Sequence, residues 1–154
     1  MDIREELKIG SLESPYYKAM LSIVYTGQWL RNGINRALKP IGLTEPQFNV
    51  LAVLFRHRTE RANMGDIAAG MVQKESNTTR IVDKLVARGW AIRETCPVNR
   101  RKVDVYITPE GRKVFREGHR RVKAFHASLR DRWPPGEEDR ISDSLDALRE
   151  DPEV

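Results

Sequence analysis

The sequence predicts a mainly α-helical fold that carries one small β-hairpin. Apolar residues recur at helical spacing along most of the 154 residues, and helix-capping residues precede these stretches. Only two short runs, residues 90–95 and 103–107, read as strands. The predicted order is therefore four helices, two strands and two helices. With 40% apolar and 32% charged residues, the composition fits a single globular domain over residues 1–154.

The first long helix is predicted over residues 14–39. Ser14 is suited to the N-cap, Pro15 to the first helical position, and Pro40 to the end. A helix of this length extends about 36 Å, which is more than a core of this size covers. We therefore expect a second chain to cover its apolar stripe. Residues 1–13 are expected to be frayed.

Two helices are predicted to follow in the centre of the fold. Thr44 and Gln47 form a capping-box pattern before a segment that is apolar on most sides. A shorter helix is expected to begin at Asn63. Its small residues, 68–70, would let it approach the next helix closely, as the first helix of a helix-turn-helix must.

The segment 73–102 predicts a polar-faced helix followed by a hairpin rich in cations. Thr78, Ile81, Val82 and Leu85 form an apolar stripe, and Gly89 follows where the helix should end. The other side of this helix and the tip of the hairpin are polar or basic. These residues are Lys74, Ser76, Asn77, Arg80, Lys84, Arg100, Arg101 and Lys102. Such a plan is typical of a winged helix-turn-helix, here predicted over residues 43–108.

The charge distribution agrees with this prediction. Residues 74–102 contain eight Lys or Arg and three acids, a surplus of five. The whole chain contains 27 basic and 22 acidic residues, which is the same surplus. The positive excess is therefore concentrated in one segment, as expected of a face that binds a polyanion.

The C-terminal region predicts two more helices within residues 109–150. Thr108 and Pro109 begin the first, residues 134–136 (Pro-Pro-Gly) break it, and the second starts at Glu137. Apolar residues of these helices and of helix 14–39 lack partners within one chain. Symmetric pairing of these end helices would give a two-fold homodimer.

The motifs in this order resemble those of the MarR family of bacterial transcriptional regulators. The matching residues are Leu43-Thr44-x-x-Gln47-x-x-Val50-Leu51, Ile67-Ala68, Ser76-x-x-Thr79-Arg80-x-Val82-Asp83-x-Leu85-x-x-x-Gly89, Asn99-Arg100-Arg101 and Ile107-Thr108-Pro109-Glu110-Gly111. The resemblance covers residues 43–115 and implies a winged-helix homodimer that binds pseudo-palindromic duplex DNA.

The resemblance also implies roles for individual residues. Ser76, Asn77, Thr79 and Arg80 would lie at the major groove, and Arg101 would enter the minor groove. Asn99 departs from the family, which has Asp at this position; a neutral amide would hold the wing arginine less strongly. From charge alone, Lys74, Lys84, Arg88 and Arg100 are expected to contact phosphates. Lys102 completes the predicted DNA-binding set.

Relatives in this family bind phenolic or aromatic acids between the dimer helices and the winged module. Residues of this chain that could line such a crevice are Tyr17, Met20, Tyr25, Trp29, Arg31 and Phe48. The alternative is that these residues form the core of the dimer.

Other chemistries find little support in the sequence. Cys96 could act as a redox switch, because nearby cations lower a thiol pKa. His57, His119 and His126 lack further ligands at metal-binding spacing, so no metal and no cofactor are expected. Phosphate loops and catalytic motifs are missing from the sequence, so we expect no enzyme. The absence of an export signal and of a long apolar run predicts a cytoplasmic protein.

Two functions remain open at this stage. The first is a ligand-responsive, sequence-specific DNA-binding repressor. The alternative is a winged-helix module that binds another protein without specific DNA binding. Steep salt dependence with a site preference would distinguish the first from the second.

Overall fold

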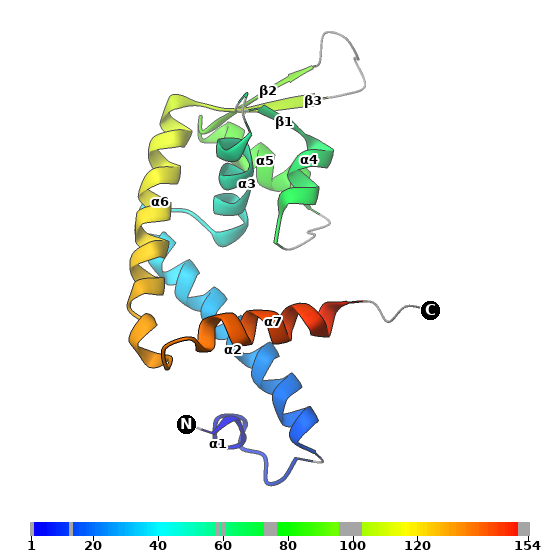
Figure 1. Cartoon of the computed structure of the whole chain (residues 1–154). Helices are drawn as coiled ribbons and strands as arrows, with labels where there is room; N and C mark the ends of the chain where they lie inside the picture. Colours follow the sequence, from blue (N-terminus) through cyan, green and yellow to red (C-terminus); the bar gives the residue numbers. More distant parts are fainter. Residues whose placement is uncertain are drawn as a thin grey trace.

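The computed structural model describes residues 2–12, 14–57, 59, 61–72, 77–95 and 103–150. The predicted fold class is confirmed: the chain is mainly helical and carries one three-stranded antiparallel sheet (Figure 1). The elements are α1 (Ile3–Leu7), α2 (Pro15–Leu38), η1 (Lys39–Ile41), α3 (Glu45–Arg56), β1 (Arg61–Asn63), α4 (Met64–Gly70), α5 (Thr78–Ala87), β2 (Ala91–Thr95), β3 (Val103–Ile107), α6 (Pro109–Ala127), η2 (Arg130–Arg132) and α7 (Glu137–Arg149).

Helix α2 begins and ends as its caps predict. The Ser14 hydroxyl accepts a hydrogen bond from the Tyr17 amide at 3.2 Å, and Pro15 occupies the first turn. Only Gly33 and Leu38 of this 24-residue helix are buried. Val24 is 71% exposed, and in Figure 1 the N-terminal half of α2 runs away from the sheet. The apolar stripe therefore remains largely uncovered within one chain.

The expectation of a frayed N-terminus is wrong for residues 3–7, which form α1 against α2. Ile3 is 8% exposed, and the Tyr25 hydroxyl donates a hydrogen bond to Glu6. Asp2 caps α1 and accepts from the Lys18 ammonium at 2.8 Å. Hydrogen bonds from Arg4 and then Lys18 hold the pKa of the Asp2 carboxyl far below its usual range. Contacts from 16 or more residues away order this segment, and local periodicity does not reveal them.

Helix α3 forms the centre of the core. Its capping box is present as predicted: the Thr44 amide donates to the Gln47 side chain at 3.1 Å, and the Gln47 amide donates back to the Thr44 hydroxyl at 3.5 Å. Val50, Leu51 and Leu54 are fully buried. Around α3 pack α4, α5, α6 and the sheet. They supply further large buried residues, which include Ile67, Val82, Leu85, Val105 and Ile107.

Helix α4 begins after its cap Asn63, as predicted, and packs on both α3 and α5, with its last glycine against α3. The Asn63 side chain accepts hydrogen bonds from the amides of Gly65 and Asp66 at 2.8 and 3.0 Å. A Cβ on Gly70 would lie 2.8 Å from a methyl group of Val53, which is on α3. The glycine therefore lets α4 approach α3 closely, whereas the sequence suggested the next helix, α5.

The sheet has the order β1-β3-β2, with both pairings antiparallel. The predicted hairpin strands are confirmed, and Ala91 pairs with Ile107 at one end and Thr95 with Val103 at the other. Strand β1 was not predicted. It has only three residues, Arg61–Asn63, and is defined by its pairing with Asp104–Tyr106 of β3 and not by a pattern of its own. Residues 96–102, between β2 and β3, lie outside the described residues.

Helix α6 joins the winged module to the end helices. Thr108 caps it by accepting from the Gly111 amide at 2.9 Å, and α6 packs along both α3 and α2. The ring of Phe125 fills the space that a Cβ on Gly33 of α2 would occupy. Helix α6 ends at Ala127, before the predicted Pro-Pro-Gly break. Helix α7 then projects sideways (Figure 1) and has no buried residue.

We predict that Gly111→Ala destabilises the fold. A Cβ at this position would lie 2.0 Å from the backbone oxygen of Trp90, so the start of α6 and the turn before β2 would have to separate. The cost of such overpacking is about 1–3 kcal/mol in the free energy of unfolding, measurable by urea denaturation. The control is Gly10→Ala, because a Cβ there meets nothing within 4 Å and should change stability by less than about 0.5 kcal/mol. Equal effects of the two substitutions would contradict the role of this contact.

Candidate nucleic-acid interface

Helix α5 divides its side chains between the core and the solvent. Val82 and Leu85 are fully buried and Thr78 is 7% exposed, whereas Thr79, Arg80 and Lys84 are exposed. The division follows from helical periodicity, because residues three, four and seven positions apart share one face. Packing of the apolar stripe against α3 therefore fixes which polar side chains of α5 face outward.

The N-terminus of α5 is chemically suited to an anion. Asn77 precedes the helix and makes no side-chain capping hydrogen bond, and the first turn contains no acidic residue. The amides of a helical first turn have no partner within the helix, and the helix dipole adds partial positive charge there. Asn77, Thr79 and Arg80 are exposed around this end, so backbone amides and polar side chains offer hydrogen-bond donors together.

Two cations of α5 are available for an outside partner. Arg80 and Lys84 are one helical turn apart, and among the residues that the structure describes neither has an ion-pair partner. The one acid of α5, Asp83, is 2.6 Å from the guanidinium of Arg93 on β2. This pairing offsets the negative charge of Asp83, so the exposed face of α5 stays positive. It also ties β2, the strand that leads toward the predicted wing, to the helix.

Several predicted DNA-binding residues lie outside the described residues. These are Lys74 and Ser76 before α5, and Asn99, Arg100, Arg101 and Lys102 between the hairpin strands; Cys96 lies there as well. The structure does define where these segments are attached, at the start of α5 and at the ends of β2 and β3.

Arg88, which was predicted to contact a phosphate, makes two contacts within the chain. Its guanidinium lies over the indole ring of Trp90, with Cζ 3.8 Å from the ring centroid. Its Nη1 donates a hydrogen bond to the carbonyl oxygen of Gly42. The contact joins residues 46 positions apart, so the sequence pattern gave no sign of it.

Of the six candidate effector-binding residues, Tyr25 and Trp29 line one small cavity together, and the other four do not line it. Phe48 stacks on Phe115 in the core, with ring centroids 5.4 Å apart, and the Arg31 Nε lies 3.5 Å from a Glu45 carboxylate oxygen. Tyr25 donates to Glu6 of α1, Tyr17 is 46% exposed, and Met20 is half-buried. Among the six, only Trp29 also lines a second, larger cavity.

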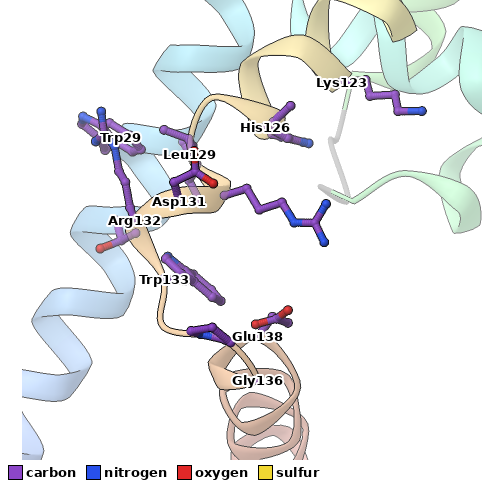
Figure 2. A pocket seen from close by; sticks show the side chains of 14 residues that line it. Trp29, Lys123, His126, Leu129, Asp131, Arg132, Trp133, Gly136 and Glu138 are labelled. Atoms are coloured by element: carbon purple, nitrogen blue, oxygen red, sulfur yellow. The ribbon is translucent and has the colours of Figure 1, made fainter.

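This larger cavity has a volume of about 890 Å³ and lies between α2, the end of α6 and the start of α7. Figure 2 shows Trp29 and Trp133 on its walls, with Glu138 at its lower edge. The cations that line it are Lys123, Arg130 and Arg132, and Arg132 lies 5.8 Å from the ring of Trp29. This cavity was not predicted from the sequence, because the pattern of residues 129–136 indicates only the end and break of a helix.

The described residues contain no group of three or more His, Cys, Asp or Glu side chains arranged to hold a metal ion. Within the same residues, no helix combines the length and the apolar character needed to cross a bilayer.

Comparison with known proteins identifies the module. Residues 43–103 match the MarR family profile. The HTH-type transcriptional regulator YfiV of Bacillus subtilis is 34% identical over 87 residues, which are 54% of this chain and 53% of that protein. The transcriptional repressor MprA of Escherichia coli is 27% identical over 105 residues, 67% of this chain and 60% of MprA. The matched region thus spans between half and two thirds of these relatives.

Solved structures share the fold along almost the whole chain. A MarR-family regulator from Rhodococcus sp. RHA1 superposes with a TM-score of 0.75 at 26% identity, covering 89% of this chain and 96% of that one. CouR of Rhodococcus jostii, solved with p-coumaroyl-CoA, gives 0.75 at 25% identity, with coverages of 93% and 99%. A mutant MarR of E. coli, solved with operator DNA, gives 0.78 at 22% identity, with coverages of 92% and 100%. With its α4–α5 helix-turn-helix and its three-stranded sheet, the chain shares the winged-helix fold of these MarR-family regulators, and its residues 43–103 match that family.

Proposed function

We propose that this protein is a sequence-specific, double-stranded DNA-binding transcription regulator that acts as a homodimer on a pseudo-palindromic operator and represses transcription. The observation that carries the proposal is the exposed face of α5, where Thr79, Arg80 and Lys84 point outward beside a helix N-terminus at which Asn77 makes no side-chain capping hydrogen bond. Two relatives support it: MprA is a transcriptional repressor, and the MarR mutant of the same fold is solved with operator DNA.

Helix α5 is the part that would enter the major groove. An α-helix fits this groove, and short polar side chains near its N-terminus reach base edges. Ser76, Asn77, Thr79 and Arg80 take this role in the proposal. Lys74, Lys84 and Arg100 neutralise phosphates, which adds affinity without sequence choice. Arg101, at the wing, enters the minor groove, with Asn99 and Lys102 beside it.

The uncovered end helices support dimerisation. Tyr16, Val24 and Ile23 of α2 are 67%, 71% and 40% exposed, and Ile141 and Leu148 of α7 are 37% and 46% exposed. Both helices thus present apolar side chains that the described residues of one chain cover only in part. Pairing of residues 14–39 and 109–150 with a second copy would bury them. It would also hold two copies of α5 about 34 Å apart, one turn of duplex DNA.

We propose as well that a small aromatic or phenolic molecule binds this protein as an effector. CouR, of the same fold, is solved with p-coumaroyl-CoA, and the cavity beside Trp29 combines aromatic walls with three cations. A ligand there would act by binding unequally to arrangements of the dimer in which the two α5 helices have different spacing.

The central experiment is selection of bound duplexes from a random pool, followed by titration of the enriched duplex at several salt concentrations. We expect a two-fold symmetric consensus and an affinity that falls steeply with salt. Binding without site preference, together with salt-independent capture of a protein, would favour the interaction module instead.

Substitution of Lys84 should change the salt dependence. Lys84→Ala removes one phosphate contact, so we expect the slope of log K against log salt to become smaller in magnitude by about 0.9. Lys113→Ala is the matched control, because Lys113 is an exposed lysine on α6 that pairs with Glu110 at 3.3 Å. If the two variants have the same slope, Lys84 is not a DNA contact.

Substitution of Arg101 should lower affinity for the selected duplex. A minor-groove arginine reads local shape, so Arg101→Ala should cost about 1–3 kcal/mol on that duplex and less on random DNA. Fluorescence anisotropy with both duplexes measures the difference. Unchanged affinity for the selected duplex would exclude this role.

Polar substitutions in α7 should disrupt the dimer. Ile141→Gln combined with Leu148→Gln removes the exposed apolar stripe, and we expect sedimentation to show a shift toward monomer at micromolar concentration. Asp143→Gln, on the opposite face of α7, should leave the dimer intact. A double variant that sediments like the parent would remove α7 from the interface.

A further inference from the structure

We infer that Arg88 is a positioning residue that sets where recognition helix α5 stands relative to α2, and thereby the half-site spacing that the dimer accepts. The inference rests on the proposed function, because spacing has meaning only for a dimer on duplex DNA. It differs from a phosphate contact, the role that the charge of Arg88 suggested.

Arg88 connects the C-terminal end of α5 to the corner between α2 and α3. It is the residue directly after the last helical position of α5, Ala87. Its Nη1 donates to the Gly42 carbonyl, and its guanidinium stacks on Trp90, which is 8% exposed. The planar guanidinium serves both contacts at once, which a lysine ammonium cannot do. A cation at the C-terminus of a helix is also favourable to the helix dipole.

The corner that Arg88 contacts has a glycine, Gly42, at the point of contact. Gly42 has a φ of 68°, a left-handed conformation that favours glycine. A Cβ at Gly42 would lie 2.7 Å from Nη2 of Arg88. Glycine at this position therefore serves both the turn and the close approach of the guanidinium.

The same corner is fixed to α2 by polar contacts. The Glu45 amide, at the start of α3, donates to the Asn35 side chain of α2 at 3.0 Å, and the Glu45 carboxylate is 3.5 Å from Nε of Arg31. Asn35 in turn donates to the Arg31 carbonyl at 3.1 Å. Arg31 and Asn35 belong to α2, so a movement of α2 would also move the corner. Because Arg88 binds the corner, α5 would move as well.

The turn that contains Arg88 is also attached to α6. The Thr108 hydroxyl donates to the Gly89 carbonyl at 2.8 Å, and the Thr108 amide donates to the Trp90 carbonyl at 3.1 Å. Residues 88–90 thus make contacts that link the recognition helix α5 to both long end helices, α2 and α6. Loss of Arg88 removes one link to the α2 side of this junction and leaves the α6 side and the packing of α5 on α3 in place.

The two possible roles of Arg88 give different results in one experiment. The probe is the duplex enriched in the selection, in three forms: unchanged, and with one base pair inserted or deleted between the half-sites. Each base pair shifts the half-sites by about 3.4 Å and rotates one relative to the other. The parent, Arg88→Met and Lys84→Ala are titrated on all three forms at several salt concentrations. Thermal unfolding of each variant checks that it is folded.

If Arg88 positions α5, Arg88→Met should reduce the difference in affinity between the three duplexes. The slope of log K against log salt should stay that of the parent. We expect the parent to prefer the selected spacing by about tenfold or more, and Arg88→Met by about threefold or less, within the range of ordinary coupling between sites. Lys84→Ala should do the opposite, with a smaller slope and an unchanged preference for spacing.

A second variant tests the contact from the other side. Gly42→Ala places a Cβ against the guanidinium and should also reduce the spacing preference. Combined with Arg88→Met, it should add little further loss of that preference, because both changes remove the same contact. Arg88→Lys keeps the charge, so a loss of spacing preference in this variant would trace the effect to geometry and not to charge.

A smaller salt slope with unchanged spacing preference in Arg88→Met would overturn the inference and make Arg88 a phosphate contact. An equal loss of affinity on all three duplexes would overturn it as well. Failure of the parent to prefer any duplex is a separate result: it would reject the proposed function.

Discussion

Packing of α5 against α3 is the interaction on which the candidate interface depends. Val82 and Leu85 are fully buried beside Val50 and Leu51, and this burial fixes the rotation of α5 about its axis. A rotation by one residue, about 100°, would turn Thr79 and Asp83 inward in one sense, or Arg80 and Lys84 in the other, and would expose apolar side chains to water. The hydrophobic core therefore decides which chemistry the helix presents, although no core residue contacts the surface that it defines.

Which cations of this protein are available to a binding partner depends on the contacts that each already makes within the chain. Arg93 pairs with Asp83 and Arg88 lies on Trp90, so both serve the fold. Arg80 and Lys84 have no such partner among the described residues and remain available. On α6, Arg120 and then Arg121 donate to Glu117 and lower its pKa to about 2, so that carboxylate stays ionised at acidic pH as well. A positive surplus in the sequence is thus only partly a binding surface.

The contrast between the module and the end helices follows from where apolar surface is covered. The module buries its core within one chain, around α3. Helices α2 and α7 do not, since α7 has no buried residue and α2 has two. In a single chain the winged module thus has a buried core, whereas the end helices keep apolar side chains exposed. This exposed apolar surface is the physical basis for proposing a second copy.

The sequence by itself determined the helices, the hairpin and the two faces of α5, because caps and periodicity act over a few residues: Ser14, Thr44, Asn63 and Thr108 each cap the helix they predict. Tertiary structure alone decided the rest. It ordered α1 through Tyr25 and Lys18, formed β1 by pairing with β3, and drew Arg88 to Gly42. It also separated Phe48 and Arg31 from the cavity beside Trp29. These outcomes depend on groups far apart in the chain, and the spacing of residues along a sequence does not encode which distant groups meet.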